Sequence, residues 1–303
     1  MHQVFRWICS SLVLVVCLPA AAYPAPAHLS AAEIVAKNVA ARGGLEAWRA
    51  VKTMTLSGKM GAGGNQRATL QVPTQAQATV AASKTQKAQL PSRRVDEVYL
   101  PFVMELARGR KMHLELQVGG KTALQVYDGV NGWKLRPYLN RLEVEPYAAD
   151  EAKIASVQSE LDGPLVDYAA KGTRVDLDGT EKVEDRDTYK LKLTLKSGDV
   201  THVWVDAQSF LETKVEGEPR RLDGTFHPVE VYYRDYRNVN GLQIPFVLET
   251  RVLPVAKTAT GLGDTPVPAE KTLIEKVAIN PPFDAGVFSK PVVTASTTMP
   301  KAN

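Results

Sequence analysis

The segment Lys190-Leu191-Lys192-Leu193-Thr194-Leu195-Lys196 alternates polar and apolar residues without interruption. Ser197-Gly198-Asp199 follows it, and a second alternating run extends from Thr201 to Asp206. Strict alternation places apolar side chains on one face of a strand and polar side chains on the other. A short break that contains glycine, between two runs of this kind, indicates a β-hairpin. The stretch from Leu161 to Tyr236, which contains this hairpin, is therefore predicted to form antiparallel sheet with one apolar face.

Alternating segments also occur on both sides of this stretch. An antiparallel sheet of roughly ten or more strands normally curls or closes on itself, so we expect a curled sheet. Pro101 interrupts one segment and favours an edge strand or a bulge there. The predicted strands are Thr53 to Met60, Glu97 to Ala107, Met112 to Val118, Thr122 to Tyr127, Arg141 to Glu145, Thr173 to Leu177, Thr188 to Leu195, Val200 to Asp206, Phe210 to Glu216, Val229 to Arg234, Leu242 to Arg251 and Lys271 to Ile279, with Arg67 to Val72 as a further candidate.

Two helices are predicted before the first strand. Ser30 is a suitable N-cap, and Glu33 stands three residues later, which is the capping-box spacing. The alanine-rich run that follows extends to Arg42, and Gly43-Gly44 ends it as a left-handed C-terminal cap does. Leu45 to Val51 is predicted to form a second, short helix.

The hydrophobic period changes in the middle of the chain, between Tyr147 and Leu161. Ile154, Val157 and Leu161 are spaced three and four residues apart, which is typical of one face of a helix. The expected fold class is therefore mainly β: a curled antiparallel sheet, or half-closed β-barrel, with an N-terminal helix and a mid-chain helix that covers the apolar face as a lid or plug.

The N-terminus has the features of a secretory signal peptide. Arg6 precedes an uncharged apolar run from Trp7 to Leu18, and the small residues Ala20-Ala21-Ala22 offer a cleavage site. Residues 1–22 are thus expected to be a cleaved signal peptide, and the rest a soluble exported protein. Cys17 follows Val16, which does not suit a lipoprotein signal, although lipid attachment there stays an alternative.

Residues 23–291 are expected to form a single domain. Within it, 73–94 is rich in small and polar residues and is predicted to be a long surface loop or a weak hairpin. Residues 254–270 are rich in Thr, Gly and Pro and are predicted to be a mobile loop. Residues 292–303 have little to pack and are expected to be a disordered tail.

Composition and motifs argue against several classes of function. The formal net charge is +4, and the basic residues form no stripe, so nucleic acid is not an expected partner. Both cysteines lie in the predicted signal peptide, and no zinc-binding or nucleophile-elbow motif occurs. Asp176-Leu177-Asp178-Gly179 begins like a calcium loop but lacks the later ligands, so we expect a hairpin turn there. No enzymatic activity, metal or cofactor is therefore expected.

Several segments share their order along the chain with a known family. They are ARGGLEAW at Ala41–Trp48, MTLSG at Met54–Gly58, YDGVNGW at Tyr127–Trp133, DGPLVDY at Asp162–Tyr168, Val205-Asp206 with Phe210-Leu211, DYRNVNGL at Asp235–Leu242, and Asn280–Phe283 with Phe288–Pro291. Together they resemble the LolA-like family of outer-membrane lipoprotein-sorting and periplasmic lipid-carrier proteins. The resemblance extends from about Glu33 to Pro291.

This resemblance implies a half-closed barrel with a helical lid, and the binding of lipid or lipoprotein acyl chains inside it. It further implies location in the periplasm, transfer of cargo from an inner-membrane donor protein to an outer-membrane acceptor protein, and transient contact with a membrane surface. The same fold also serves lipid-sensing regulators, so a regulator or scaffold of an envelope complex is the alternative. A hydrolase of envelope lipids is a third possibility.

The apolar faces of the predicted strands and helix supply the candidate ligand-binding residues. Alternation defines the face but not what lies across it, so these residues are equally suited to filling a dry core. A void of several hundred Å³ between the sheet and the mid-chain helix would favour a carrier, and a packed interior would favour a scaffold. The candidates are Leu100, Phe102, Met104, Leu106, Met112, Leu114, Leu116, Ile154, Val157, Leu161, Leu191, Leu193, Leu195, Val203, Val205, Val229 and Val231.

Overall fold

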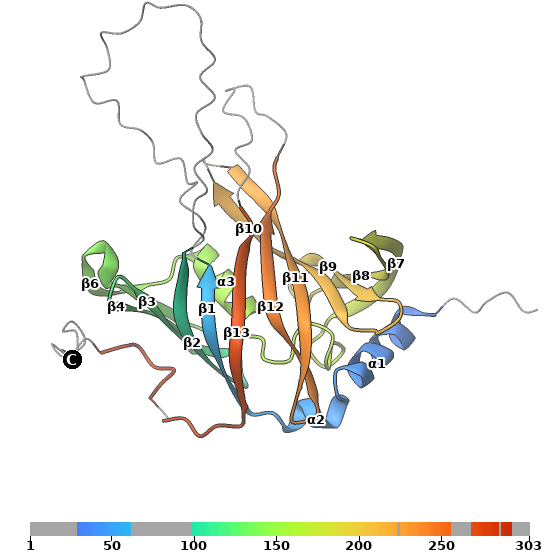
Figure 1. Ribbon diagram of the computed structural model, residues 1–303, viewed down its shortest axis with the longest axis horizontal. Helices are drawn as coiled ribbons and strands as arrows, with labels where there is room; N and C mark the ends of the chain where they lie inside the picture. The colour runs from blue at the N-terminus through green and yellow to red at the C-terminus, as the bar shows by residue number, and fades with distance from the viewer. Residues whose placement is uncertain (1–28, 62–97, 223–224, 256–267, 285, 293–303) are drawn as a thin grey trace, which may run out of the picture.

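A computed structural model describes residues 29–61, 98–222, 225–255, 268–284 and 286–292 of the chain (Figure 1). The predicted signal peptide, the candidate strand from Arg67 to Val72, the loop 73–94 and the tail beyond residue 292 lie outside these residues. So does most of the predicted loop 254–270.

The described residues form one antiparallel sheet of thirteen strands, with few helices. None of these helices has the length and apolar character needed to cross a membrane. The helices are α1 (Ala31–Ala41), α2 (Leu45–Ala50), α3 (Ala149–Gln158) and the short 3₁₀ helix η2 (Pro137–Leu139). The strands are β1 (Thr53–Gly61), β2 (Tyr99–Ala107), β3 (Lys111–Val118), β4 (Lys121–Tyr127), β5 (Gly132–Arg136), β6 (Arg141–Pro146), β7 (Arg174–Val183), β8 (Arg186–Thr194), β9 (Val200–Asp206), β10 (Glu212–Leu222), β11 (Thr225–Val239), β12 (Leu242–Val252) and β13 (Glu270–Ile279).

The order of the strands explains how the chain covers its own sheet. The order is β6-β5-β4-β3-β2-β1-β13-β12-β11-β10-β9-β8-β7, so β1 and β13 pair in the middle and the sheet does not close. The chain therefore leaves the sheet at one edge, after β6, and rejoins it at the opposite edge, at β7. Residues 147–173, the crossing segment, have to traverse a face of the sheet to make this connection. Figure 1 shows α3 lying against the back of the curled sheet.

The predicted fold class is confirmed, and the differences are local. β5 is not predicted from the sequence, because it is short and begins within the turn dipeptide Asn131-Gly132. Asp178-Gly179 does not form the expected hairpin turn; it lies inside β7, where the register with β8 shifts between Leu177 and Thr180. A bulge at an edge strand accommodates the glycine, whose φ is +104°.

The mid-chain helix packs through a different residue from those predicted. It ends at Gln158, so Leu161 lies beyond it in a turn, where it is buried. Within α3, Ala155 faces the sheet and is 3% exposed, whereas Val157 is 50% exposed. A small residue at the contact allows the helix backbone to approach the sheet closely.

Two hydrophobic clusters lie on the covered face of the sheet. The first core joins α2 to β1–β4 and β12–β13, with Trp48, Met112 and Leu242 among its most buried members. The second core joins α1 to β8 and β9 through residues such as Ile34 and Leu191. The crossing segment contributes to both cores: it supplies Ala155, Leu161 and Val166 to the first core and Leu165 to the second.

Local signals place α1 and α2 as the sequence predicts. The Ser30 hydroxyl accepts a hydrogen bond from the Glu33 amide at 3.3 Å, and the Glu33 carboxylate accepts one from the Ser30 amide at 2.8 Å. Gly43 follows α1 with a φ of +116°, and a side chain there would collide with the carbonyl oxygen of Gly241. This close approach docks the α1–α2 junction against the turn between β11 and β12.

A buried group of charges holds the crossing segment to the rest of the fold. Asp162 is fully buried, and its carboxylate accepts hydrogen bonds from Arg108 and, at 2.6 Å, from Lys171. Arg108 also donates to the carbonyl oxygens of Trp48 and Val51, at 2.5 and 2.9 Å. These residues, the Asp162 cluster, therefore connect the crossing segment to α2 and to the turn after β2.

The environment of Asp162 favours its charged form. Burial by itself would raise the pKa of Asp162, but the hydrogen bonds and charges of Lys171 and Arg108 outweigh this effect and hold the pKa below its usual value. Because the folded-state pKa is depressed, the carboxylate stabilises the fold above its unfolded-state pKa, about 3.9. This contribution is lost as the pH falls through the folded-state pKa.

Asp162→Asn is expected to lower the free energy of unfolding at neutral pH by on the order of 3 kcal/mol, because it leaves two cations without their buried partner. The free energy of unfolding of the wild type should fall as the pH drops below about 4, and the variant should show a smaller fall. Urea unfolding measured at several pH values tests both effects. Asp176→Asn, which removes a half-exposed carboxylate, is the control and should cost less than about 1 kcal/mol. Equal costs for the two variants would contradict the structural role of Asp162.

Candidate functional site

An apolar groove of about 460 Å³ lies between the N-terminal helices and the crossing segment. Its volume falls in the range of about 300–1,000 Å³ that is typical of small-molecule sites. The residues that line it are Ala32, Val35, Ala36, Val39 and Ala40 of α1, Gly44 and Leu45 at α2, and Leu165, Asp167, Tyr168, Ala169 and Ala170 of the crossing segment.

The sequence of α1 creates one wall of this groove. Ala32, Ala36 and Ala40 are spaced four residues apart, so they lie above one another on one face of the helix. All three are exposed, and their small side chains leave space between the helix and residues 165–170. A larger side chain on this face would fill the groove.

The floor of the groove lies where the two cores meet. Val35 and Leu165 belong to the second core, and both are buried. Leu45 packs against the first core, and Val39 packs against both. The apolar surface of the groove is therefore continuous with the interior of the protein.

Asp167 is the one charged residue among the described residues that line the groove. Both of its carboxylate oxygens accept hydrogen bonds from the Arg49 guanidinium of α2, at 2.7 and 2.9 Å. The Arg49 hydrogen bond holds the pKa of Asp167 below its usual value, and the smaller effect of burial opposes it. Since this charge is already paired, the groove presents a predominantly apolar surface.

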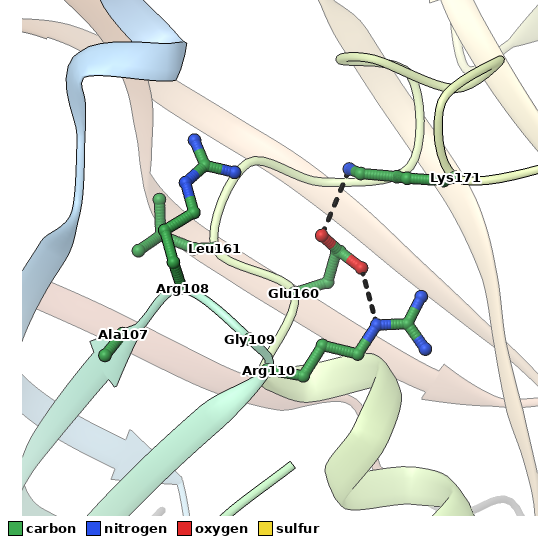
Figure 2. A pocket seen from close by; sticks show the side chains of 7 residues that line it. All are labelled: Ala107, Arg108, Gly109, Arg110, Glu160, Leu161 and Lys171. Carbon is green, nitrogen blue, oxygen red and sulfur yellow. Dashed lines mark hydrogen bonds and ion pairs between the residues drawn. The ribbon is translucent and has the colours of Figure 1, made fainter.

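A second, smaller pocket of about 240 Å³ lies between the crossing segment and the turn after β2 (Figure 2). Its lining includes Arg108 and Arg110 from the turn after β2, and Glu160 and Lys171 from the crossing segment. We call it the cationic pocket. Leu161, one of the predicted ligand-binding residues, also lines it.

The structure places the predicted ligand-binding residues mainly in the two cores. None of them lines the apolar groove. Phe102, Leu106, Met112, Leu114 and Leu161 belong to the first core, with Met104 and Leu116 packed against it; Leu191, Leu193, Val203 and Val205 belong to the second. Val229 is buried outside both cores, Leu100, Ile154, Leu195 and Val231 are partly buried, and Val157 is half exposed.

These residues pack against other protein side chains in the structure, so their contact with a ligand stays a prediction. The residues of the groove are not among the sequence-based candidates, because alanines on an exposed helix face carry no strong hydrophobic signal. Their spacing of four residues beside Val35 and Val39 is the pattern that could have indicated an open apolar face.

Comparison with known proteins supports the fold. No protein-family model matches the chain, and no curated protein matches it significantly. Among solved structures, a LolA superfamily protein from Nitrosomonas europaea is similar with a TM-score of 0.51 and 12% identity, over 87% of this chain and 99% of that one.

Two further solved structures are similar at lower TM-scores. A putative outer membrane lipoprotein-sorting protein domain from Vibrio parahaemolyticus has a TM-score of 0.47 and 12% identity, over 85% of this chain and 95% of that one. A DUF1329 family protein from Desulfovibrio piger has a TM-score of 0.49 and 10% identity, over 85% of this chain and 96% of that one. At these identities the similarity concerns the fold alone. The Nitrosomonas structure confirms that the chain has the LolA-like fold that its ordered motifs predict.

Proposed function

We propose that the protein is a periplasmic carrier of lipid or lipoprotein acyl chains, without catalytic activity, and that it binds an acyl chain in the apolar groove between α1, α2 and residues 165–170. The observation that supports this proposal best is the groove itself, which has the volume of a ligand site and a lining whose one charge is paired with Arg49. The LolA-like fold and the secretory character of residues 1–22 agree with it.

The chemistry of the groove suits an acyl chain. Each methylene group transferred from water into an apolar environment contributes about 0.8 kcal/mol. The alanine and valine side chains of α1 offer apolar surface to such a chain but few hydrogen-bonding groups. The affinity of the site would therefore depend on the length of the acyl chain rather than on polar groups of the ligand. Because the groove is open to solvent along α1, a bound chain could leave without unfolding of the sheet.

The position of the groove also suits cargo of different lengths. Its floor is made by side chains of both cores, and the crossing segment covers those cores. In this proposal a displacement of the crossing segment would open the first core, which contains the predicted residues Phe102 and Leu114, to a longer chain. In this proposal an inner-membrane protein donates the cargo and an outer-membrane protein accepts it.

Ala36→Trp is expected to weaken binding of a fluorescent fatty acid by about tenfold or more. An indole in the groove would exclude at least two methylene groups of the chain, each contributing about 0.8 kcal/mol. Because Ala36 is exposed, the fold should be retained, which circular dichroism can verify. Fluorescence titration measures the affinity.

Ala149→Trp is the matched control, since Ala149 is an exposed alanine in the first turn of α3 that does not line the groove. It should bind the fatty acid as the wild type does. Wild-type affinity of the Ala36→Trp variant would place the ligand elsewhere.

The packed covered face favours a second candidate function, a lipid-sensing regulator or scaffold of an envelope complex. Phe102, Met112 and Leu193 are at most 3% exposed, so their part of the interior is filled by protein. A regulator would bind a protein partner persistently and need not carry lipid between membranes.

Lipid extraction distinguishes the two candidates. If the protein is a carrier, material purified from periplasm without detergent should yield about one acyl lipid per chain by mass spectrometry, and it should pass this lipid to acceptor vesicles. Absence of lipid, together with recovery of a stable protein complex after crosslinking, would favour the regulator and count against the carrier.

A further inference from the structure

The cationic pocket brings together three basic side chains from two distant parts of the sequence. Arg108 and Arg110 project from the turn between β2 and β3, and Lys171 comes from the end of the crossing segment. Figure 2 shows the Glu160 carboxylate between Lys171 and Arg110, with Arg108 and Leu161 next to them. The pocket therefore combines charged side chains with apolar surface from Ala107 and Leu161.

The charges in the pocket leave an excess of positive charge. Glu160 lies between two of the cations, 2.9 Å from Arg110 Nε and 3.0 Å from Lys171 Nζ. Asp162, behind the pocket, is shared by Lys171 and Arg108. Three cations thus face two carboxylates, and the Arg110 side chain is 52% exposed, so it can accept a further anionic partner.

The backbone at Arg110 is unusual for this residue type. Its φ is +57°, in the left-handed region that favours glycine, and Gly109 before it has a φ of +83°. Gly129 also packs closely against this turn: a side chain at Gly129 would collide with the carbonyl oxygen of Gly109. Glycine or asparagine would suit this backbone better, so the geometry of the turn does not explain why position 110 is an arginine.

The cationic pocket and the apolar groove are formed by neighbouring parts of the crossing segment. Asp167 lines the groove, and the charges of Lys171 and Arg108 both act on its carboxylate. Residues 165–170 form one wall of the groove, and Lys171, the next residue, lines the pocket. An amphiphile whose chain lies in the groove would carry its headgroup toward these cations.

We propose that the cationic pocket binds a phosphate group, as the headgroup of an anionic lipid whose acyl chain lies in the apolar groove. A phosphate is held by the guanidinium of Arg110 and the ammonium of Lys171, the same two groups that Glu160 bridges. The inference that this phosphate belongs to a lipid rests on the function proposed above. Free phosphate would bind to the same two cations, but no acyl chain would occupy the groove.

Calorimetric titrations with three probes test this proposal: lysophosphatidylglycerol, a monoacylglycerol with the same acyl chain, and inorganic phosphate. The wild type should bind the anionic lipid about tenfold more tightly than the uncharged one, as expected for one hydrogen-bonded charge pair. Arg110→Gln and Arg110→Gly should abolish this preference and leave monoacylglycerol binding unchanged. Glu160→Gln should strengthen binding of the anionic lipid, because it removes the competing carboxylate.

Two controls make the result specific. Arg141→Gln removes an equally exposed arginine on β6 and should retain the preference. Arg110→Gly relieves the left-handed backbone, so its midpoint of thermal unfolding should not fall by more than that of Arg141→Gln. Loss of the preference in Arg141→Gln as well would mean that general surface charge causes it, and would overturn the proposal.

The remaining outcomes separate the pocket from the groove. If the wild type binds both lipids equally, the phosphate site is wrong and the acyl groove stands. If phosphate and the anionic lipid bind in an Arg110-dependent way while the uncharged lipid does not bind, the phosphate site stands and the acyl groove is wrong. Absence of binding by all three probes would overturn both.

Discussion

The buried carboxylate of Asp162, held between Arg108 and Lys171, is the interaction on which the covered face of the sheet depends. Without these partners a fully buried charge would be too costly to retain, and with them it connects three separate elements. Arg108 reaches from it to the backbone of α2, and Lys171 closes the crossing segment onto itself through the carbonyl oxygen of Gly163. Arg42 of the α1 C-terminus adds a further hydrogen bond, to the carbonyl oxygen of Asp162, at 2.8 Å.

The need for this connection follows from the topology. Strands β1 to β6 extend the sheet in one direction and β7 to β13 extend it in the other, so one segment has to cross from edge to edge. Beyond α3 that segment consists of turns, and its backbone hydrogen bonds there are local, such as the one from the Lys171 amide to the Asp167 carbonyl oxygen. Its position is set by a few buried apolar residues, such as Leu165 and Val166, together with the Asp162 cluster. Both the apolar groove and the cationic pocket are bordered by it, so the two candidate sites depend on the same anchoring.

Much of the fold is predictable from the sequence because its signals are local. Alternation along β8 and β9, the capping box at Ser30 and Glu33, and the glycine after α1 each concern neighbouring residues, and the structure contains all of them. The candidate site is less predictable. Residues such as Leu193 and Met112 lie on the apolar faces as expected, yet what lies against them is protein contributed by distant parts of the chain.

The sequence by itself determined the strands, their apolar faces, the ends of the first helix and the mainly β character of the chain, because these depend on interactions over a few residues. Only the tertiary structure decided where apolar surface stays open. The groove requires the alanines of α1 to face residues 165–170, more than a hundred positions away, and the pocket requires Arg110 to face Lys171. Sequence periodicity does not predict such contacts, because they form only when the crossing segment lies across the sheet and the ion pairs of Asp162 hold it there.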